Sequence, residues 1–189
     1  MFEKIKAHKS VIIKISVALV VALFLIGVRL HNVPVVYDIN VTLNGIQARI
    51  GDADYAEETT ISFRGTYSRY RLGTRANVFR GRVEVEGYDF TFDNRLTVSF
   101  DVDSGGSTLY YQGFDHRPYG RTSILAEVLG RIWLEPCFSQ VLITVYDPPL
   151  GWTSYDGLYI SAPATNREEA AELAGRMTES AWSSVEIKW

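Results

Sequence analysis

A period-two alternation of apolar and polar residues runs through most of the chain beyond Asn32 and constrains its fold more than any other feature. Over residues 79–86, for instance, Phe79, Val83 and Val85 fall on one side and charged residues on the other. Successive side chains of a β-strand point to opposite faces, so this spacing predicts strands with one buried face.

Further strands are predicted wherever the alternation recurs. They cover residues 35–43, 59–67, 96–103, 108–112, 124–134, 140–146 and 157–161. Turn-forming residues separate them, for example at Asn44–Gly45, Gly51–Asp52 and Asp147–Pro149. Short strands divided by tight turns, without interleaved helices, predict a mainly β fold, either an antiparallel sandwich or a strongly curled sheet.

One helix is predicted near the C-terminus. Asn166 is a favourable N-cap, and Glu169 follows three residues later as in a capping box. An apolar stripe at helical spacing is formed by Ala170, Leu173, Ala174 and Met177. Gly175 lowers the intrinsic stability of such a helix by about 1 kcal/mol relative to alanine, so we expect the helix to depend on packing against the sheet.

An apolar segment precedes the β-rich region. Residues 11–31 contain an uncharged run from Ile15 to Val28, and Lys14 is the only charge between Val11 and that run. About 20 apolar residues in a helix span the hydrocarbon core of a bilayer, so the segment predicts an N-terminal transmembrane helix. Basic residues are retained on the cytoplasmic side, and lysines gather at the start of the segment: Lys4, Lys6, Lys9 and Lys14.

The predicted organisation is therefore a cytoplasmic tail (residues 1–10), a signal-anchor helix in the lipid bilayer (residues 11–31) and an extracytoplasmic β-rich domain (residues 32–189) of a single-pass cell-membrane protein. A cleaved secretory signal peptide is an alternative, since a basic start before a short apolar core fits it as well, although no A-x-A cleavage pattern follows. A buried helix of a soluble protein is the third interpretation.

Charge and cysteine content exclude some functions. The chain has a formal net charge of −3, and every lysine except Lys188 precedes residue 15, so the β-rich region is acidic. We therefore expect no nucleic-acid partner. Cys137 is the only cysteine, which rules out an intramolecular disulfide, and its apolar neighbours predict that it is buried. We expect no cofactor, no metal and no catalytic residue, because no framed motif for them is present.

The densest charged feature is a group of arginines interleaved with tyrosines, to which Arg71 and Arg75 also belong. The candidate ligand-binding residues are Arg64, Tyr67, Arg69, Tyr70, Arg80 and Arg82, together with Trp152 from a later aromatic segment. Arginine and tyrosine together can recognise carboxylates, phosphates or sugars. The simpler interpretation is a solvated sheet face on which the arginines pair with Glu84 and Glu86.

Two other features have weaker chemical interpretations. His116 is the only histidine of the β-rich region, and a hydrolase that uses it is an alternative function, although no nucleophile motif accompanies it. Acidic residues beside glycines at 51–58 and 101–106 partly match a calcium loop, but the complete twelve-residue EF-hand spacing is missing. Whether these loops bind calcium stays open.

The segments FRGTYSRY, FRGRVEVEGYDF and APATNREEAAELA resemble parts of small uncharacterised single-pass membrane proteins of Gram-positive bacteria. The resemblance covers Val35 to Met177, implies an exported β-rich domain, and supplies no activity or catalytic residues. We expect a membrane-anchored, non-enzymatic domain with a protein-binding or accessory role in the cell envelope. A module that binds glycans or the cell wall is the alternative.

Overall fold

The computed structural model describes the chain except for residues 1, 71–74, 103–105, 117–121, 147–150 and 180–188. In the described residues there are two α-helices, α1 (Phe2–Asn32) and α2 (Arg167–Thr178), and two short 3₁₀ helices, η1 (Asp89–Phe92) and η2 (Pro136–Phe138). The strands are β1 (Val35–Arg49), β2 (Asp52–Arg69), β3 (Val78–Val85), β4 (Leu96–Asp101), β5 (Ser107–His116), β6 (Thr122–Leu134), β7 (Val141–Val145) and β8 (Leu158–Ala162).

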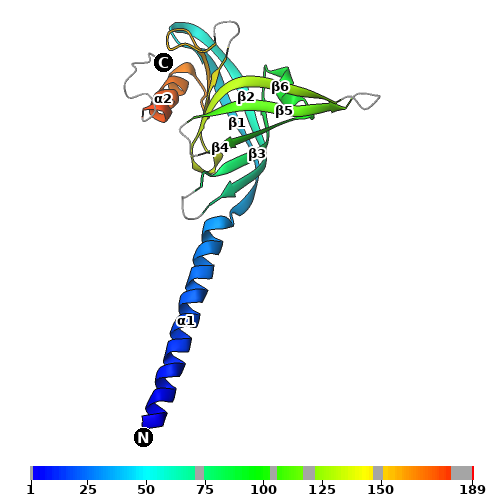
Figure 1. Ribbon diagram of the computed structural model, residues 1–189. Helices are drawn as coiled ribbons and strands as arrows, with labels where there is room; N and C mark the ends of the chain where they lie inside the picture. The colour runs from blue at the N-terminus through cyan, green and yellow to red at the C-terminus, as the bar shows by residue number, and fades with distance from the viewer. Residues whose placement is uncertain (1, 71–74, 103–105, 117–121, 147–150, 180–188) are drawn as a thin grey trace.

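The strands form a closed antiparallel barrel in which each strand pairs with its neighbours in chain order and β8 returns to β1 (Figure 1). Closure is made by Ile46–Arg49 of β1, which pair with Leu158–Ser161 of β8. The fold is mainly β, but the predicted sandwich or curled sheet is wrong. The alternation of apolar and polar residues specifies strands with one buried face. A sandwich, a curled sheet and a barrel all bury that face. Which of them forms depends on a pairing between strands at opposite ends of the β-rich region.

β1 is longer than predicted because it runs through a turn signal. Asn44 and Gly45 pair with Thr60 and Thr59 of β2 and do not form a turn. A Cβ atom on Gly45 would lie 2.5 Å from the carbonyl oxygen of Ser161, so glycine lets β8 approach β1 closely. The chain turns instead at Gly51, whose φ of +78° favours glycine.

Side chains fill the interior of the barrel. The inward-facing residues form one apolar cluster, and its aromatic members are Phe63, Phe79, Phe100, Tyr111 and Phe138. The hydroxyl of Tyr111 donates to the carbonyl oxygen of Val83 at 2.8 Å, and burial raises its pKa. A barrel of eight strands is just wide enough for side chains to fill it or for one small ligand to occupy it. Here aromatic rings occupy that space, which leaves the ends and the outer surface for recognition.

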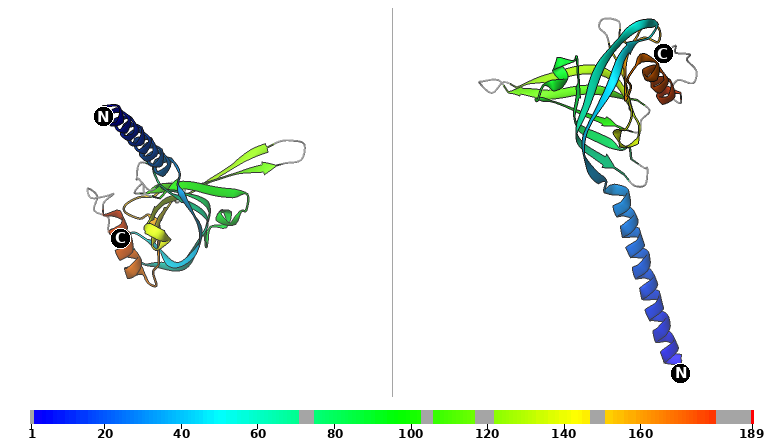
Figure 2. Two further views of the ribbon diagram at one scale, coloured as in Figure 1. Left: turned by 90° about the horizontal axis from the view of Figure 1, so that it is seen from below. Right: turned by 180° about the vertical axis from the view of Figure 1, so that it is seen from behind.

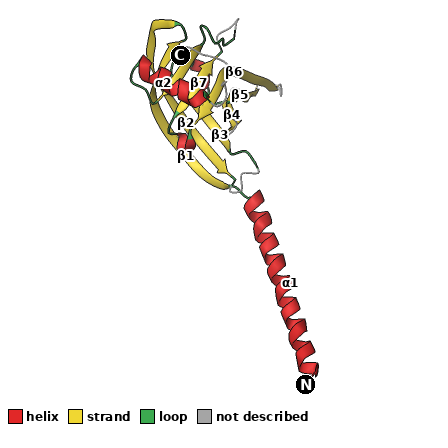
Figure 3. Cartoon of the chain, turned by 90° about the vertical axis from the view of Figure 1, so that its left-hand side faces the viewer, coloured by secondary structure: helices red, strands yellow, loops and turns green. Residues whose placement is uncertain are grey.

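The predicted C-terminal helix is confirmed as α2, which lies against the outside of the barrel (Figure 3). The side chain of Asn166 accepts a hydrogen bond from the amide of Glu169 at 2.9 Å, as the capping box predicts. The Glu169 carboxylate accepts from the amide and the hydroxyl of Thr165, and these bonds lower its pKa. The buried face of α2 packs with residues of β1, β6, β7 and β8 in a second apolar cluster, which comprises Ile46, Ala48, Ile50, Trp133, Leu142, Tyr159, Ala164, Ala170 and Ala174.

The substitution Gly175→Ala is expected to raise the free energy of unfolding by about 1 kcal/mol, because alanine is the better helix former. There is room for the methyl group, since a Cβ atom at Gly175 would lie 3.6 Å from Cδ1 of Trp189, an ordinary contact. Urea denaturation followed by circular dichroism measures the change. The reverse exchange Ala174→Gly in the same helix should destabilise, and a loss of stability in both variants would contradict the prediction.

The helix α1 extends away from the barrel (Figure 1). Among the described residues, no helix combines the length and the apolar character that a membrane span requires. The predicted transmembrane helix over residues 11–31 is therefore wrong, and with it the predicted single-pass localisation in the cell membrane. The uncharged run from Ile15 to Val28 rises only about 21 Å, less than the roughly 30 Å of a hydrocarbon core.

Candidate functional site

The candidate ligand-binding residues predicted from the sequence separate into three places. Arg64, Arg80 and Arg82 lie on the outer wall of the barrel, where Arg64 and Arg82 are opposite one another on β2 and β3. Their guanidinium groups lie 3.6 and 3.8 Å from the carboxylate of Glu84, and Arg82 also donates to Asn94. The carboxylate between them offsets the repulsion of two like charges placed directly opposite. This surface therefore has the geometry of a paired sheet face.

Glu86 and Trp152 have other surroundings. Glu86 accepts a hydrogen bond from the hydroxyl of Thr60 at 3.0 Å. Trp152 packs against the second apolar cluster, and its ring lies 6.2 Å from that of Trp189. The structure therefore does not bring Trp152 together with the arginines of β2 and β3.

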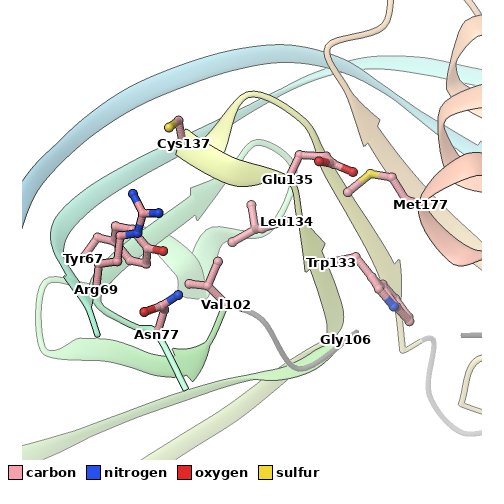
Figure 4. Close-up of a pocket in the computed structure, with 10 residues that line it drawn as sticks. All are labelled: Tyr67, Arg69, Asn77, Val102, Gly106, Trp133, Leu134, Glu135, Cys137 and Met177. Atoms are coloured by element: carbon pink, nitrogen blue, oxygen red, sulfur yellow. The ribbon is translucent and has the colours of Figure 1, made fainter. Parts of the chain in front are cut away.

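Tyr67 and Arg69 lie at the end of β2 and line a pocket of about 460 Å³ (Figure 4). We call it the mouth pocket, because it is built from the ends of strands at one end of the barrel. Its lining residues are Tyr67, Arg69, Asn77, Val102, Gly106, Trp133, Leu134, Glu135, Cys137 and Met177. Tyr70 adjoins it through a hydrogen bond of 2.7 Å from its amide to Oδ1 of Asn77.

Sequence reasoning missed most of this pocket, because its residues come from β2, β6, η2, α2 and single positions that adjoin β3, β4, β5 and β6. In an up-and-down barrel, β2, β4 and β6 finish at the same end, where β3 and β5 begin. The one indication in the sequence was that Asn77, Val102 and Glu135 lie at strand ends. These positions indicate a shared pocket only if the strands are known to form a closed barrel.

Beneath the pocket, η2 turns the chain inward. Cys137 and Phe138 have φ values of 63° and 59°, in the left-handed region that non-glycine residues rarely adopt. Such residues cost about 1–3 kcal/mol each and persist where the surrounding structure holds them. The conformation directs the Phe138 ring into the core and leaves Cys137 exposed. The prediction that Cys137 is buried is wrong, because its neighbour Phe138 fills the interior position.

A second surface lies on a projecting hairpin of β5 and β6 (Figures 1 and 2). β4 pairs with β5 only at Tyr111–Gly113, and β7 pairs with β6 only at Gly130–Leu134. We call residues 110–116 and 122–128 of this hairpin the β5–β6 arm. In the described chain, the arm has β4 beside it only at residues 111–113, and its outermost part (residues 114–116 and 122–124) is a two-stranded ribbon. The alternation of apolar and polar residues did not predict this arm. The same alternation occurs in a strand with a neighbouring strand and in a strand without one.

The outer face of the β5–β6 arm carries an uncharged stripe. Tyr110 is opposite Val128, Gln112 is opposite Ala126, and Phe114 is opposite Ile124. The large side chains are exposed, with 42% for Tyr110, 59% for Phe114, 72% for Ile124 and 41% for Val128. Contiguous exposed apolar residues of this kind mark interaction surfaces.

Arg95 connects the β5–β6 arm to the barrel. Its guanidinium lies 2.7 Å from the Asp93 carboxylate and 3.1 Å from that of Asp115 on the arm. Hydrogen bonds from the side chain and the amide of Arg95 lower the pKa of Asp93 to about 2. A lowered pKa means that Asp93 keeps its charge as the pH falls below the range where free carboxyl groups titrate, so it continues to orient Arg95.

The acidic segments and His116 are the remaining chemical candidates from the sequence. Within the described residues, no group of three or more His, Cys, Asp or Glu side chains could hold a metal ion. Asp52 in the acidic segment 51–58 accepts from the amide of Asp54 at 3.1 Å, and Glu57 accepts from Tyr55 at 3.2 Å. Residues 103–105 of the other acidic segment, Arg71 and the side chain of His116 lie outside the described part.

Fold and surfaces together define an eight-stranded antiparallel up-and-down barrel with an outer C-terminal helix, a mouth pocket and a projecting arm. Comparison with protein-family models finds no match, and comparisons with curated proteins and with solved structures find none either.

Proposed function

We propose that this protein is a non-enzymatic binding protein that docks a protein partner on the β5–β6 arm. The observation that carries the proposal is the uncharged, exposed stripe on a ribbon that extends beyond the barrel wall. A two-stranded ribbon such as the outermost part of the arm is only marginally stable by itself in water, and a partner that covers the stripe would stabilise it.

The apolar side chains of the arm supply the affinity. Phe114 and Ile124 face each other across the two strands and are both more than half exposed. Full burial of such side chains contributes about 1–2 kcal/mol each when part of their surface is already covered. These two residues are the expected centre of the interface, since a few large apolar residues carry most of the binding energy in such contacts.

The open edge of β6 supplies the specificity. In the described chain, β7 pairs with β6 from Gly130 onward, and no strand pairs with residues 122–128 on that edge. An exposed edge is a template for an additional strand from another chain. The partner segment would therefore be extended, with apolar residues at alternate positions that meet Ile124, Ala126 and Val128.

The proposal is tested by placing a photo-crosslinking amino acid at Ile124 of the full chain, in the cells that produce it, and in a second variant at Tyr155. Tyr155 is a matched control because it is 85% exposed and lies outside the arm. We expect one defined protein adduct at position 124 and none at position 155.

The captured partner is then purified, and its affinity for the full chain is measured by calorimetry. Phe114→Asp should weaken binding at least about tenfold, because it places a charge in an apolar contact. Tyr155→Asp should leave binding unchanged, and circular dichroism checks that both variants are folded. Identical adducts at both positions, or equal affinities for both variants, would refute the proposal.

A further inference from the structure

We propose that the mouth pocket is a carbohydrate site that holds one or two sugar rings. This inference is independent of the proposed docking function, since the pocket and the β5–β6 arm share no residue. The volume of about 460 Å³ lies within the range of small-molecule sites and exceeds the space that a lone ion needs.

The walls of the pocket are aromatic and held in place. Tyr67 stacks on Tyr37 with ring centroids 6.2 Å apart and meets Phe138 edge-on at 5.6 Å. On the other side, Trp133 lies beneath the guanidinium of Arg131 at 5.5 Å and against Gly106, where a Cβ atom would overlap the indole. A pocket whose walls are already ordered loses little entropy when it binds a ligand.

The floor of the pocket restricts the length of the ligand. Leu134 packs against the main core, and Phe138 fills the barrel below it. A long alkyl chain therefore cannot enter the interior, as it could in an eight-stranded barrel with an empty lumen. A short ligand with an apolar face, such as the C–H face of a pyranose ring, suits this floor.

The polar rim determines the chemistry of the ligand. Figure 4 shows Arg69 and Asn77 on one side of Leu134 and Glu135 on the other. Arg69 only donates hydrogen bonds and an ionised Glu135 only accepts them, while Oδ1 of Asn77 already accepts from the amide of Tyr70. Hydroxyl groups donate and accept, so a sugar of one or two rings that carries several of them can pair with both Arg69 and Glu135.

The same rim disfavours other small ligands. A fatty acid or a phosphate would bring a negative charge towards Glu135, and the repulsion would offset its attraction to Arg69. An α-amino acid carries both charges around one carbon atom, whereas Arg69 and Glu135 lie on opposite sides of Leu134 (Figure 4). A neutral sugar is not repelled by Glu135, and its hydroxyl groups do not need two opposite charges close together.

Calorimetry and amide NMR titration of the full chain test the inference with cellobiose, maltose and N,N′-diacetylchitobiose. Octanoate and L-phenylalanine serve as the non-sugar ligands. We expect at least one disaccharide to bind and to shift the amide signals of Tyr67 and Leu134. Arg69→Leu should weaken this binding about 2- to 10-fold, the effect of losing one hydrogen bond.

The matched control is Arg80→Leu, which removes another exposed arginine from the outer wall of the barrel. It should leave sugar binding unchanged. Binding of no disaccharide, binding of octanoate or phenylalanine alone, or equal weakening by both arginine substitutions would overturn the inference. Arg69 is exposed, so its replacement should not prevent folding.

Discussion

Replacing Phe138 with alanine is expected to lower the free energy of unfolding by about 3–5 kcal/mol, the cost of removing a buried phenylalanine. The ring is 1% exposed, and its centroid lies 5.3 Å from that of Phe63 and 5.4 Å from that of Phe79. No neighbouring side chain can fill the space readily, because the surrounding rings are themselves held by the barrel wall. Urea denaturation monitored by circular dichroism measures the loss.

The control for this experiment is Phe92→Ala in η1, where the ring is 49% exposed. Substitutions of exposed residues usually change stability by no more than about 0.5 kcal/mol. If Phe138→Ala and Phe92→Ala lower the free energy of unfolding by the same small amount, the Phe138 ring does not belong to the core of the barrel. Loss of the ring should also deepen the floor of the mouth pocket, since Phe138 lies beneath it.

Replacing Gly81 with valine is expected to lower the free energy of unfolding by about 3 kcal/mol, the upper part of the range for overpacking. Gly81 on β3 is directly opposite Gly65 on β2, and a Cβ atom on Gly81 would overlap the carbonyl oxygen of Arg64. The obstructing atoms belong to the backbone, so a change of rotamer cannot relieve the overlap. The two strands would have to separate.

Arg80→Val is the matched control for Gly81→Val, because the side chain of Arg80 is exposed in the same strand and valine suits a strand. We expect a change within about 0.5 kcal/mol for this surface substitution. Thermal and urea unfolding of both variants measure the difference. Equal stability of the two variants would show that the close approach of β2 and β3 is not required.

Local features of this fold were predictable because their causes are local. The helix α2 follows from the Asn166 cap and the spacing of Ala170 and Leu173, all within a few residues. The pairing of Arg64 and Arg82 with Glu84 follows from the alternation in two neighbouring strands. In both cases the contacts connect residues that are close in the sequence or in adjacent strands.

Features that depend on closure were not predictable from the same patterns. The pairing of Ile46 with Ser161 decides between a barrel and a sandwich, and no alternation specifies it. The mouth pocket depends on that closure as well, so Tyr67 and Arg69 were candidates while Trp133 and Glu135 were not. The turn signal at Asn44–Gly45 was misleading, because that glycine accommodates β8 and not a reversal of the chain.

The up-and-down order of the strands has a consequence for how many molecules the protein can hold. The mouth pocket lies at the end where β2, β4 and β6 finish, whereas the arm projects away from the side of the barrel (Figures 1 and 2). A sugar in the first and a polypeptide on the second would not collide. Under the two proposals together, the barrel would bridge two unlike molecules in one ternary complex.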